Sequence, residues 1–220
     1  MQSIISIILS VFLNFSVSSC AVDGEKTMEV NLQNLQDGIE VATFAGGCFW
    51  CTEAVFERVK GVNDVVSGYT GGDEENPTYY EVSYGKTHHA EAVQIYYDPK
   101  VISYQDLLDI FFIAHNPMQA NGQGPDLGAQ YRPVIFYHDQ AQKKTAEATI
   151  QKLNASGKYS ATIVTEVEAY DKFWMAEDYH QNYYELNPGN PYIIQQAVPK
   201  VKKFKKTFPQ LVKDKYAVEN

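Results

Sequence analysis

Segments with strand-like and helix-like patterns alternate along the chain, and this alternation limits the possible folds more than any other feature. Alternating or short apolar runs bounded by turn residues predict strands at residues 40–44, 62–69, 90–97, 133–137 and 161–167. Helical spacing predicts helices at residues 48–59, 78–84, 103–116, 139–154, 176–185 and 199–208. Residues 118–130, rich in Gly and Pro, form a long predicted loop, and such loops are usually functional. We expect a single α/β domain over residues 38–208.

The composition is that of a globular protein and excludes several other classes. Apolar residues make up 45% and charged residues 20% of the 220 residues, so the chain can bury a core. The net charge of −9 argues against a general nucleic-acid-binding protein, which needs a basic face. Three cysteines are too few for a disulfide scaffold in a chain of this length, so each needs its own explanation.

The first 19 residues are predicted to be a signal peptide. They carry no charged side chain, and the apolar run from Ile4 to Val17 is too short to span a bilayer. The sequence Val17-Ser18-Ser19-Cys20 resembles the lipobox of bacterial lipoproteins, where cleavage leaves a lipidated cysteine. The alternative is a plain secretory signal with an incidental Cys20. Either way we expect export, as a periplasmic protein or a membrane-anchored lipoprotein, with residues 20–37 as a tether.

Cys48 is the candidate nucleophile, because Gly46-Gly47 joins a predicted strand to the helix that starts there. The free N–H groups and dipole of a helix N-terminus favour a thiolate, which predicts a lowered pKa for Cys48. Cys51 lies one helical turn further on. One alternative is a pair of small buried residues. Another is a zinc site, but no second Cys-x-x-Cys or spaced His pair exists, and the adjacent His88 and His89 would point to opposite strand faces.

Glu91 is the candidate acid. On a strand over residues 90–97 its side chain shares one face with Val93, Ile95 and Tyr97. A carboxyl group on an apolar face has a raised pKa and can donate a proton at neutral pH. The alternative is a carboxylate paired with a cation at the end of the strand.

Five separated motifs resemble the peptide methionine sulfoxide reductase A (MsrA) family, from about Val41 to Phe208. In sequence order they are Gly46-Gly47-Cys48-Phe49-Trp50, Gly68-Tyr69-Thr70-Gly71-Gly72, Asn76-Pro77-Thr78-Tyr79, His89-Ala90-Glu91-Ala92-Val93 and Ala176-Glu177-Asp178-Tyr179-His180-Gln181. The resemblance implies a two-layer α/β sandwich with a mixed sheet, of the ferredoxin-like plait type. It also implies a catalytic domain at 38–208, a C-terminal tail at 209–220, a monomer, and no bound cofactor or metal.

The resemblance implies a role for each matching residue in reducing the S-epimer of methionine sulfoxide, free or in proteins. Cys48 attacks the sulfoxide sulfur, and Glu91 protonates the departing oxygen. The hydroxyls of Tyr79 and Tyr131 donate to that oxygen, although Tyr80 and Tyr84 lie close to Tyr79 in sequence.

The other implied site residues bind substrate. Asp126 supports the site from the 118–130 loop. Phe49 and Trp50 form an apolar pocket for the substrate methyl group, although both residues could equally be helix core.

The sequence departs from the commonest family pattern at its second cysteine. Many members have Gly where Cys51 stands and carry resolving cysteines near the C-terminus, but here Ile193 follows Asn190-Pro191-Tyr192. A subset of the family has Gly-Cys-Phe-Trp-Cys. In that subset Cys51 would condense with the Cys48 sulfenic acid to give a disulfide. The partner would then be an exported thioredoxin-like protein that supplies a dithiol.

Two other classes of function stay open at this point. One is a general thiol–disulfide oxidoreductase built on Cys48 and Cys51, which would not need Glu91. The other is a non-enzymatic lipoprotein that keeps the fold as a binding module. Turnover of methionine sulfoxide with dithiothreitol separates both from a reductase.

Overall fold

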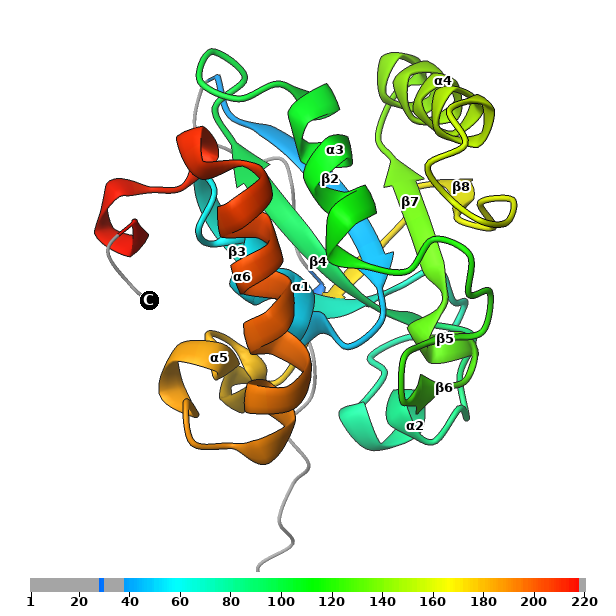
Figure 1. Cartoon of the computed structure of the whole chain (residues 1–220). Helices are drawn as coiled ribbons and strands as arrows, with labels where there is room; N and C mark the ends of the chain where they lie inside the picture. Colours follow the sequence, from blue (N-terminus) through cyan, green and yellow to red (C-terminus); the bar gives the residue numbers. More distant parts are fainter. Residues whose placement is uncertain (1–27, 30–37, 218–220) are drawn as a thin grey trace, which may run out of the picture.

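The computed structural model describes residues 28–29 and 38–217 as a sheet with helices packed on it (Figure 1). The predicted signal peptide 1–19, the lipidation candidate Cys20 and most of the predicted tether lie outside the described residues. In the described part of the chain, no helix is long and apolar enough to cross a membrane.

Seven strands form one mixed sheet in the order β1-β9-β3-β4-β2-β7-β8. Their bounds are β1 Met28–Glu29, β2 Glu40–Gly46, β3 Val62–Thr70, β4 Ala90–Tyr97, β7 Pro133–Tyr137, β8 Glu166–Ala169 and β9 Phe173–Met175. The β7–β8 pair is parallel and the other pairs are antiparallel. The short strand β1 lies within the predicted tether and pairs with β9.

The helices lie close to their predicted positions in the first two thirds of the chain. They are α1 Phe49–Phe56, α2 Tyr79–Ser83, α3 Tyr104–Ala114, α4 Gln140–Ala155, α5 Tyr183–Leu186 and α6 Val198–Thr207. The side chains of Thr78 and Ser103 cap α2 and α3 in capping boxes with Glu81 and Asp106. These caps fix where the two helices begin.

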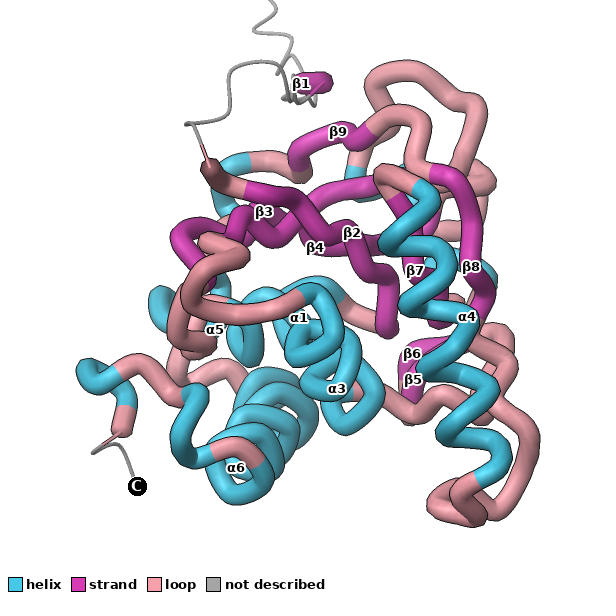
Figure 2. The backbone as a smooth tube through the Cα atoms, turned by 90° about the horizontal axis from the view of Figure 1, so that it is seen from above, coloured by secondary structure: helices cyan, strands magenta, loops and turns pink. Residues whose placement is uncertain are grey.

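The topology is that of a ferredoxin-like plait. The elements β2, α1, β3, β4, α3 and β7 follow one another as a βαββαβ unit, and their strands lie side by side as β3-β4-β2-β7. Figure 2 shows α1, α3 and α6 together on one side of the sheet. The predicted mixed sheet with helices packed on it is confirmed. This arrangement brings the end of β2, where α1 begins, beside β4, and the register pairs Phe44 with Val93.

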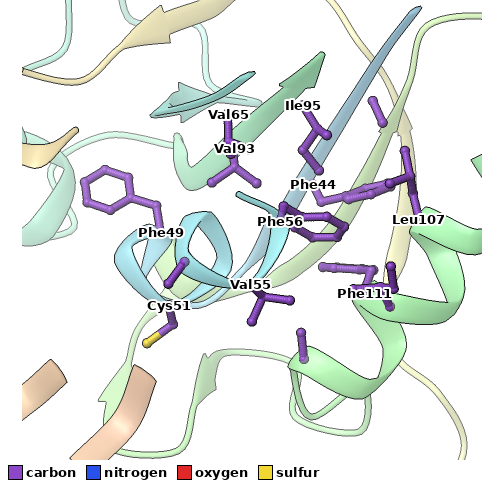
Figure 3. Close-up of a cluster of buried hydrophobic side chains, with 14 of the residues drawn as sticks. Phe44, Phe49, Cys51, Val55, Phe56, Val65, Val93, Ile95, Leu107 and Phe111 are labelled. Carbon is purple, nitrogen blue, oxygen red and sulfur yellow. The ribbon is translucent and has the colours of Figure 1, made fainter. Parts of the chain in front are cut away.

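The core lies between the sheet and these helices. Val93 and Ile95 of β4 belong to the same buried cluster as Val55 and Phe56 of α1. Figure 3 shows Val93, Ile95 and Phe56 between the strands and the helices. The face of β4 that carries residues 91, 93, 95 and 97 is therefore turned toward the helix layer, as the strand pattern predicts.

Three predictions for residues 161–185 are wrong. The strand predicted at 161–167 is β8 at Glu166–Ala169, because the amides of Ile163 and Val164 bond to Asn154 and Pro117 outside the sheet. The short strand β9 was missed, because no element was predicted at Phe173–Met175. The helix predicted at 176–185 is a 3₁₀ turn, η3 Asp178–His180, followed by α5, because Asn182 adopts a left-handed conformation (φ 54°) between them.

The described end of the chain packs against the domain. Two 3₁₀ turns, η5 Pro209–Leu211 and η6 Asp214–Tyr216, follow α6. Val212 is buried and pairs with Val59 in an antiparallel bridge. The buried Arg58 guanidinium lies between the rings of Tyr184 and Tyr216, 4.4 and 4.5 Å from their centroids.

The turn from β2 to α1 requires glycine at position 47. Gly47 has φ +89°, a region that L side chains rarely adopt. A Cβ atom there would lie 2.5 Å from Cβ of Gln123, so a neighbouring loop also occupies the space. Both the conformation and the packing of this turn exclude a side chain.

We predict that Gly47→Ala destabilises the domain more than Gly157→Ala. Gly157 also has a positive φ (+67°), but its Cβ would meet nothing within 4 Å. Conformational strain alone should lower the free energy of unfolding of Gly157→Ala by about 1 kcal/mol. Overpacking against Gln123 adds to the strain at position 47, giving a total loss of about 2–4 kcal/mol. Chemical denaturation of both variants measures this, and equal losses would contradict the close packing.

Candidate active site

Cys48 is the residue that caps the N-terminus of α1. Its backbone (φ −51°, ψ 123°) is non-helical, and α1 begins at Phe49, one residue later than predicted. The side chain is buried, with 6% of its surface exposed. The thiol therefore sits at the helix N-terminus, as predicted, in a site that largely excludes water.

Glu91 of β4 is hydrogen-bonded to the same helix terminus. The Phe49 amide donates to Glu91 Oε2 at 3.1 Å, and the carboxyl group is 1% exposed. Burial raises the pKa of Glu91 to about 8, with a further contribution from the charge of Asp126, although the Phe49 hydrogen bond opposes the rise. Glu91 is therefore mostly protonated at neutral pH and can donate a proton. In the described chain it is not the cation-paired carboxylate of the alternative interpretation.

The pKa of Cys48 is raised, so the prediction of a lowered pKa is wrong. Burial is the largest cause of the rise, followed by the hydrogen bond with Cys51, and ionisation of Glu91 would raise the pKa further. Contact with the Tyr192 hydroxyl has the opposite effect. The helix N-terminus favours a thiolate, but removal of water outweighs this effect. Cys48 is the protonated member of the pair.

Cys51 holds the more acidic thiol of the two. It is fully buried, and its amide donates to the Cys48 carbonyl at 3.1 Å, so the two residues share the first turn. The hydrogen bond from Cys48 lowers the pKa of Cys51 to about 7, against the opposing effect of burial, and Lys200 and Tyr192 add to the lowering. The two thiols titrate as a coupled pair, and the hydrogen bond between them favours ionisation of Cys51 over that of Cys48. Figure 3 shows Cys51 pointing away from the sheet, on the opposite side of α1 from Phe49.

Tyr79 and Tyr131 lie around the two predicted reacting groups. Burial raises the pKa of both phenols, and ionisation of the nearby Glu91 or Cys48 would raise both further. They therefore stay protonated and can donate hydrogen bonds to an oxygen that gains negative charge. The Glu177 side chain holds Tyr79 in place, because the Tyr79 amide donates to Glu177 Oε1 at 2.8 Å.

An aromatic cluster lines the side of the site next to Phe49 and Trp50. The His180 ring centroid lies 5.1 Å from Phe49 and 4.3 Å from Tyr79, and Trp50 Nε1 donates to His180 Nδ1 at 3.1 Å. The Tyr183 ring stacks on Trp50 at 3.8 Å with an angle of 7° between the planes. Phe49 is buried and Trp50 half-buried, so the cluster is both part of the core and an apolar wall.

Asp126 lies in the β5–β6 hairpin (Gly122–Gln123 and Asp126–Leu127), within the predicted loop. It accepts a short hydrogen bond from the Tyr192 hydroxyl. Tyr192 also contacts both cysteines and lowers the pKa of each. The structure thus brings together all the predicted residues that it describes, from Cys48 to Tyr131.

Four residues of the site were not predicted from the sequence: Glu177, His180, Tyr183 and Tyr192. Glu177 and His180 stand in the Ala176–Gln181 motif, which was the available signal. Tyr192 stands between Asn190-Pro191 and Ile193, outside the five motifs, so no motif indicated it. Their segments lie about 130 residues from Cys48 in sequence, so no local pattern placed them beside it.

The described residues offer no alternative metal centre. No group of three or more His, Cys, Asp or Glu side chains in this part of the chain could hold a metal ion. His89 is buried and accepts from the Gly72 amide, whereas His88 is exposed and lies beside Glu74. The two histidines precede β4 and do not lie on a strand, so the prediction of opposite strand faces is wrong. Both imidazoles lie beside the Glu74 carboxyl group, with no third ligand in the described chain.

Comparison with known proteins identifies the family. The family model for peptide methionine sulfoxide reductase matches residues 40–212. The chain belongs to this family. It is 53% identical to the MsrA of Haloquadratum walsbyi over 171 residues, which cover 78% of this chain and 97% of that protein. It is 47% identical to the MsrA of Polynucleobacter asymbioticus over 189 residues, or 86% and 99% of the two chains.

Solved structures support the same assignment for this MsrA-family chain. Reduced Mxr1 from Saccharomyces cerevisiae is 36% identical, with a TM-score of 0.64 over 70% of this chain and 88% of that one. Methionine sulfoxide reductase A of Corynebacterium diphtheriae is 34% identical, with a TM-score of 0.62 over 70% and 78%. The chain is therefore an oxidoreductase of the methionine sulfoxide reductase class.

We predict that Glu91→Gln lowers turnover of methionine sulfoxide by about 10²-fold or more, the usual loss for removal of a general acid. Gln has almost the same shape and can still accept from the Phe49 amide, so the fold should persist. Steady-state assays with circular dichroism as a folding control measure the effect. A variant that unfolds, but keeps its rate in the folded fraction, would show that Glu91 is structural.

The same substitution should change how stability depends on pH. An unfolded Glu ionises near pH ~4.3, whereas folded Glu91 keeps its proton to about pH 8. The folded state therefore binds the extra proton between these values, and wild-type stability falls as pH rises through this window. In Glu91→Gln the fall should be smaller. Denaturant melts at pH 4 to 9 test this, and an unchanged slope would contradict the raised pKa.

Proposed function

We propose that the chain reduces the S-epimer of methionine sulfoxide, free or in proteins, to methionine. In this proposal it is a Gly-Cys-Phe-Trp-Cys member of the family and repairs oxidised proteins. The observation that carries the proposal is the buried, protonated Glu91 bonded to the amide next to Cys48. It sets a proton donor beside a sulfur nucleophile, which a sulfoxide needs, because oxide is a poor leaving group unless it is protonated.

In the first step the Cys48 sulfur attacks the sulfoxide sulfur. The Cys48 proton passes to the Cys51 thiolate, so the nucleophile is a thiolate at the moment of attack. Glu91 gives its proton to the sulfoxide oxygen. The sulfur–oxygen bond then breaks and the hydroxyl group passes to Cys48. The products are the thioether, a Cys48 sulfenic acid and ionised Glu91, which regains its proton from water. Tyr79 and Tyr131 donate to the oxygen while it carries charge.

In the second step Cys51 resolves the sulfenic acid. Its sulfur attacks Cys48, the sulfur–oxygen bond of the sulfenic acid breaks, and the thiol proton of Cys51 leaves with the hydroxyl group as water. The balance of both steps is one sulfoxide and two thiols giving one thioether, one disulfide and one water. Cys51 is suited to this role because it shares the first helical turn with Cys48.

A dithiol reductant must then restore the two thiols. We propose an exported thioredoxin-like protein as the donor, with no cofactor bound to the chain. The rival function, general thiol–disulfide exchange, accounts for Cys48 and Cys51 but for none of the oxygen-directed groups Glu91, Tyr79 and Tyr131. A binding module without activity would need neither the cysteine pair nor a protonated buried acid.

Turnover of methionine (S)-sulfoxide with dithiothreitol tests the proposed function. We expect turnover by the wild type and none by Cys48→Ser, because an alcohol is not a nucleophile here without a strong base. The R-epimer serves as the matched control substrate and should not react. Turnover of Cys48→Ser within tenfold of the wild type would remove Cys48 from the mechanism. Disulfide exchange by the wild type without sulfoxide reduction would favour the rival function.

Cys51→Ser should reduce one equivalent of sulfoxide per chain but fail to turn over with thioredoxin, because no intramolecular disulfide can form. Small thiols should restore part of the turnover by reducing the sulfenic acid directly. Mass spectrometry after one equivalent of substrate should show a Cys48–Cys51 bond in the wild type. A persistent wild-type sulfenic acid, or a Cys48–Cys20 bond, would assign resolution elsewhere.

We also propose export of the chain, with residues 1–19 as a signal peptide, Cys20 as the lipidated residue and a monomeric catalytic domain. The support is the uncharged apolar run and the Val17-Ser18-Ser19-Cys20 sequence. Labelled palmitate should enter the wild type in a bacterial host and not the Cys20→Ala variant. Labelling of both proteins, or of neither, would contradict lipidation at Cys20.

A further inference from the structure

Trp50 owes its position to a segment far from it in sequence. Its indole N–H donates to His180, and its ring is covered by Tyr183 in a parallel stack at 3.8 Å. Residues 180–183 thus fix one wall of the apolar pocket that the proposed function assigns to the substrate methyl group. Whatever holds this segment in place also fixes the width of the pocket.

The segment has little internal structure to hold itself. It joins the 3₁₀ turn η3, through the left-handed Asn182, to the four-residue helix α5. Helix α5 has no buried residue and no side-chain cap of its own. A helix of one turn is not stable in isolation. Its position must therefore come from contacts with another part of the protein.

The Gln181 side chain is hydrogen-bonded to the backbone of Ser67 in β3. Glu53 supplies the contacts of the next two residues from the middle of α1. Its Oε1 accepts from the Asn182 amide at 3.0 Å, and its Oε2 accepts from the Tyr183 amide at 3.3 Å. Both oxygens of one carboxyl group therefore bind the two successive amides where α5 begins. At its other end α5 is bound by Arg58 of the residues just after α1, which pairs with Glu185. The helix that carries Cys48 thus also holds the pocket wall.

The burial of Glu53 is not explained by charge pairing. The side chain is fully buried, and within residues 28–29 and 38–217 the structure places no cation against it. A buried carboxyl group without a cation costs stability, and burial raises the pKa of Glu53 to about 8. Hydrogen bonds from the Asn182 and Tyr183 amides offset this cost, and the Ser67 side chain adds to their effect on the pKa. The two amides belong to the residues that set Tyr183 against Trp50.

We propose that Glu53 is a positioning residue that sets the size selectivity of the pocket by holding Tyr183 against Trp50. This inference rests on the proposed function, in which that pocket takes the sulfoxide methyl group. The well-held wall admits a methyl group and disfavours a larger alkyl group on the sulfur. Loss of the two amide contacts releases Tyr183, widens the pocket and weakens the discrimination.

The test compares methionine (S)-sulfoxide with ethionine (S)-sulfoxide, which is longer by one methylene group. One methylene is worth about 10–200-fold in kcat/KM at a well-packed apolar site, so the wild type should prefer methionine sulfoxide by at least about tenfold. In Glu53→Gln, one amide would face the Gln NH₂ group instead of an acceptor. We expect the preference to fall to about threefold or less, chiefly through a higher KM for methionine sulfoxide.

Glu57→Gln is the matched control, because Glu57 lies one turn further along the same part of the chain and is partly buried. In the described chain its carboxyl group makes no hydrogen bond to residues 180–183. It should keep the wild-type preference. In a Trp174→Phe background, Trp50 is the sole tryptophan, and its emission should change in Glu53→Gln and not in Glu57→Gln. A merely structural role would lower activity toward both sulfoxides equally and leave their ratio unchanged.

Tyr183→Leu keeps the inference open to refutation if Glu53→Gln does not fold, since it removes the stacked ring and leaves Glu53 in place. It should show the same loss of preference. An unchanged preference in the folded variants, or a wild type that reduces both sulfoxides equally well, would overturn the role of Glu53 and leave the proposed function standing. A wild type that reduces neither sulfoxide would overturn the proposed function and this inference with it.

Discussion

The hydrogen bond from the Phe49 amide to Glu91 joins the two parts of the molecule on which the site depends. One is the helix that begins after Cys48, the proposed nucleophile, and the other is the strand that carries Glu91, the proposed acid. The plait makes this bond possible, since β4 lies next to β2 in the sheet and α1 leaves directly from the end of β2. Burial of the amide without a partner would cost about 1–3 kcal/mol, so the bond stabilises the turn while it orients the carboxyl group.

Exclusion of water explains the electrostatics of the whole site. Burial raises the pKa of Glu91 and Glu53 to about 8 each and raises those of Cys48, Tyr79 and Tyr131. Glu91, Tyr79 and Tyr131 therefore keep their protons at neutral pH and can donate to a departing oxygen. The same dryness disfavours a thiolate at Cys48. At the neighbouring Cys51, the hydrogen bond with Cys48 lowers the pKa to about 7, so ionisation is easier there than at Cys48.

The sequence was sufficient for the parts of the structure that local patterns encode. Strand alternation, helical spacing and the Gly46-Gly47 turn led to the main strands and helices as far as α4. The strand pattern indicated Glu91, and motif resemblance supported Glu91 and led to Tyr131. The pKa of Cys48 was predicted with the wrong sign, because helix position is visible in a sequence whereas burial by distant segments is not. Tyr183 and Tyr192 were missed for the same reason. Tyr183 directly follows the left-handed Asn182, and Tyr192 directly precedes the π-helical turn η4 Ile193–Ala197, and no sequence periodicity indicates either feature.

The burial of the two sulfurs also bears on how a reductant can restore them. Cys51 is fully buried beneath α6, whereas Cys48 keeps 6% of its surface exposed at the turn. With the backbone of the first turn unchanged, an external thiolate can reach Cys48 and not Cys51. Cys51 would then be the leaving group. Its pKa of about 7 suits that part, because a thiol of lower pKa leaves faster, and the charge of Lys200 favours the thiolate that departs. One residue would thus hold charge before the attack, form the disulfide after it, and leave when the disulfide is reduced.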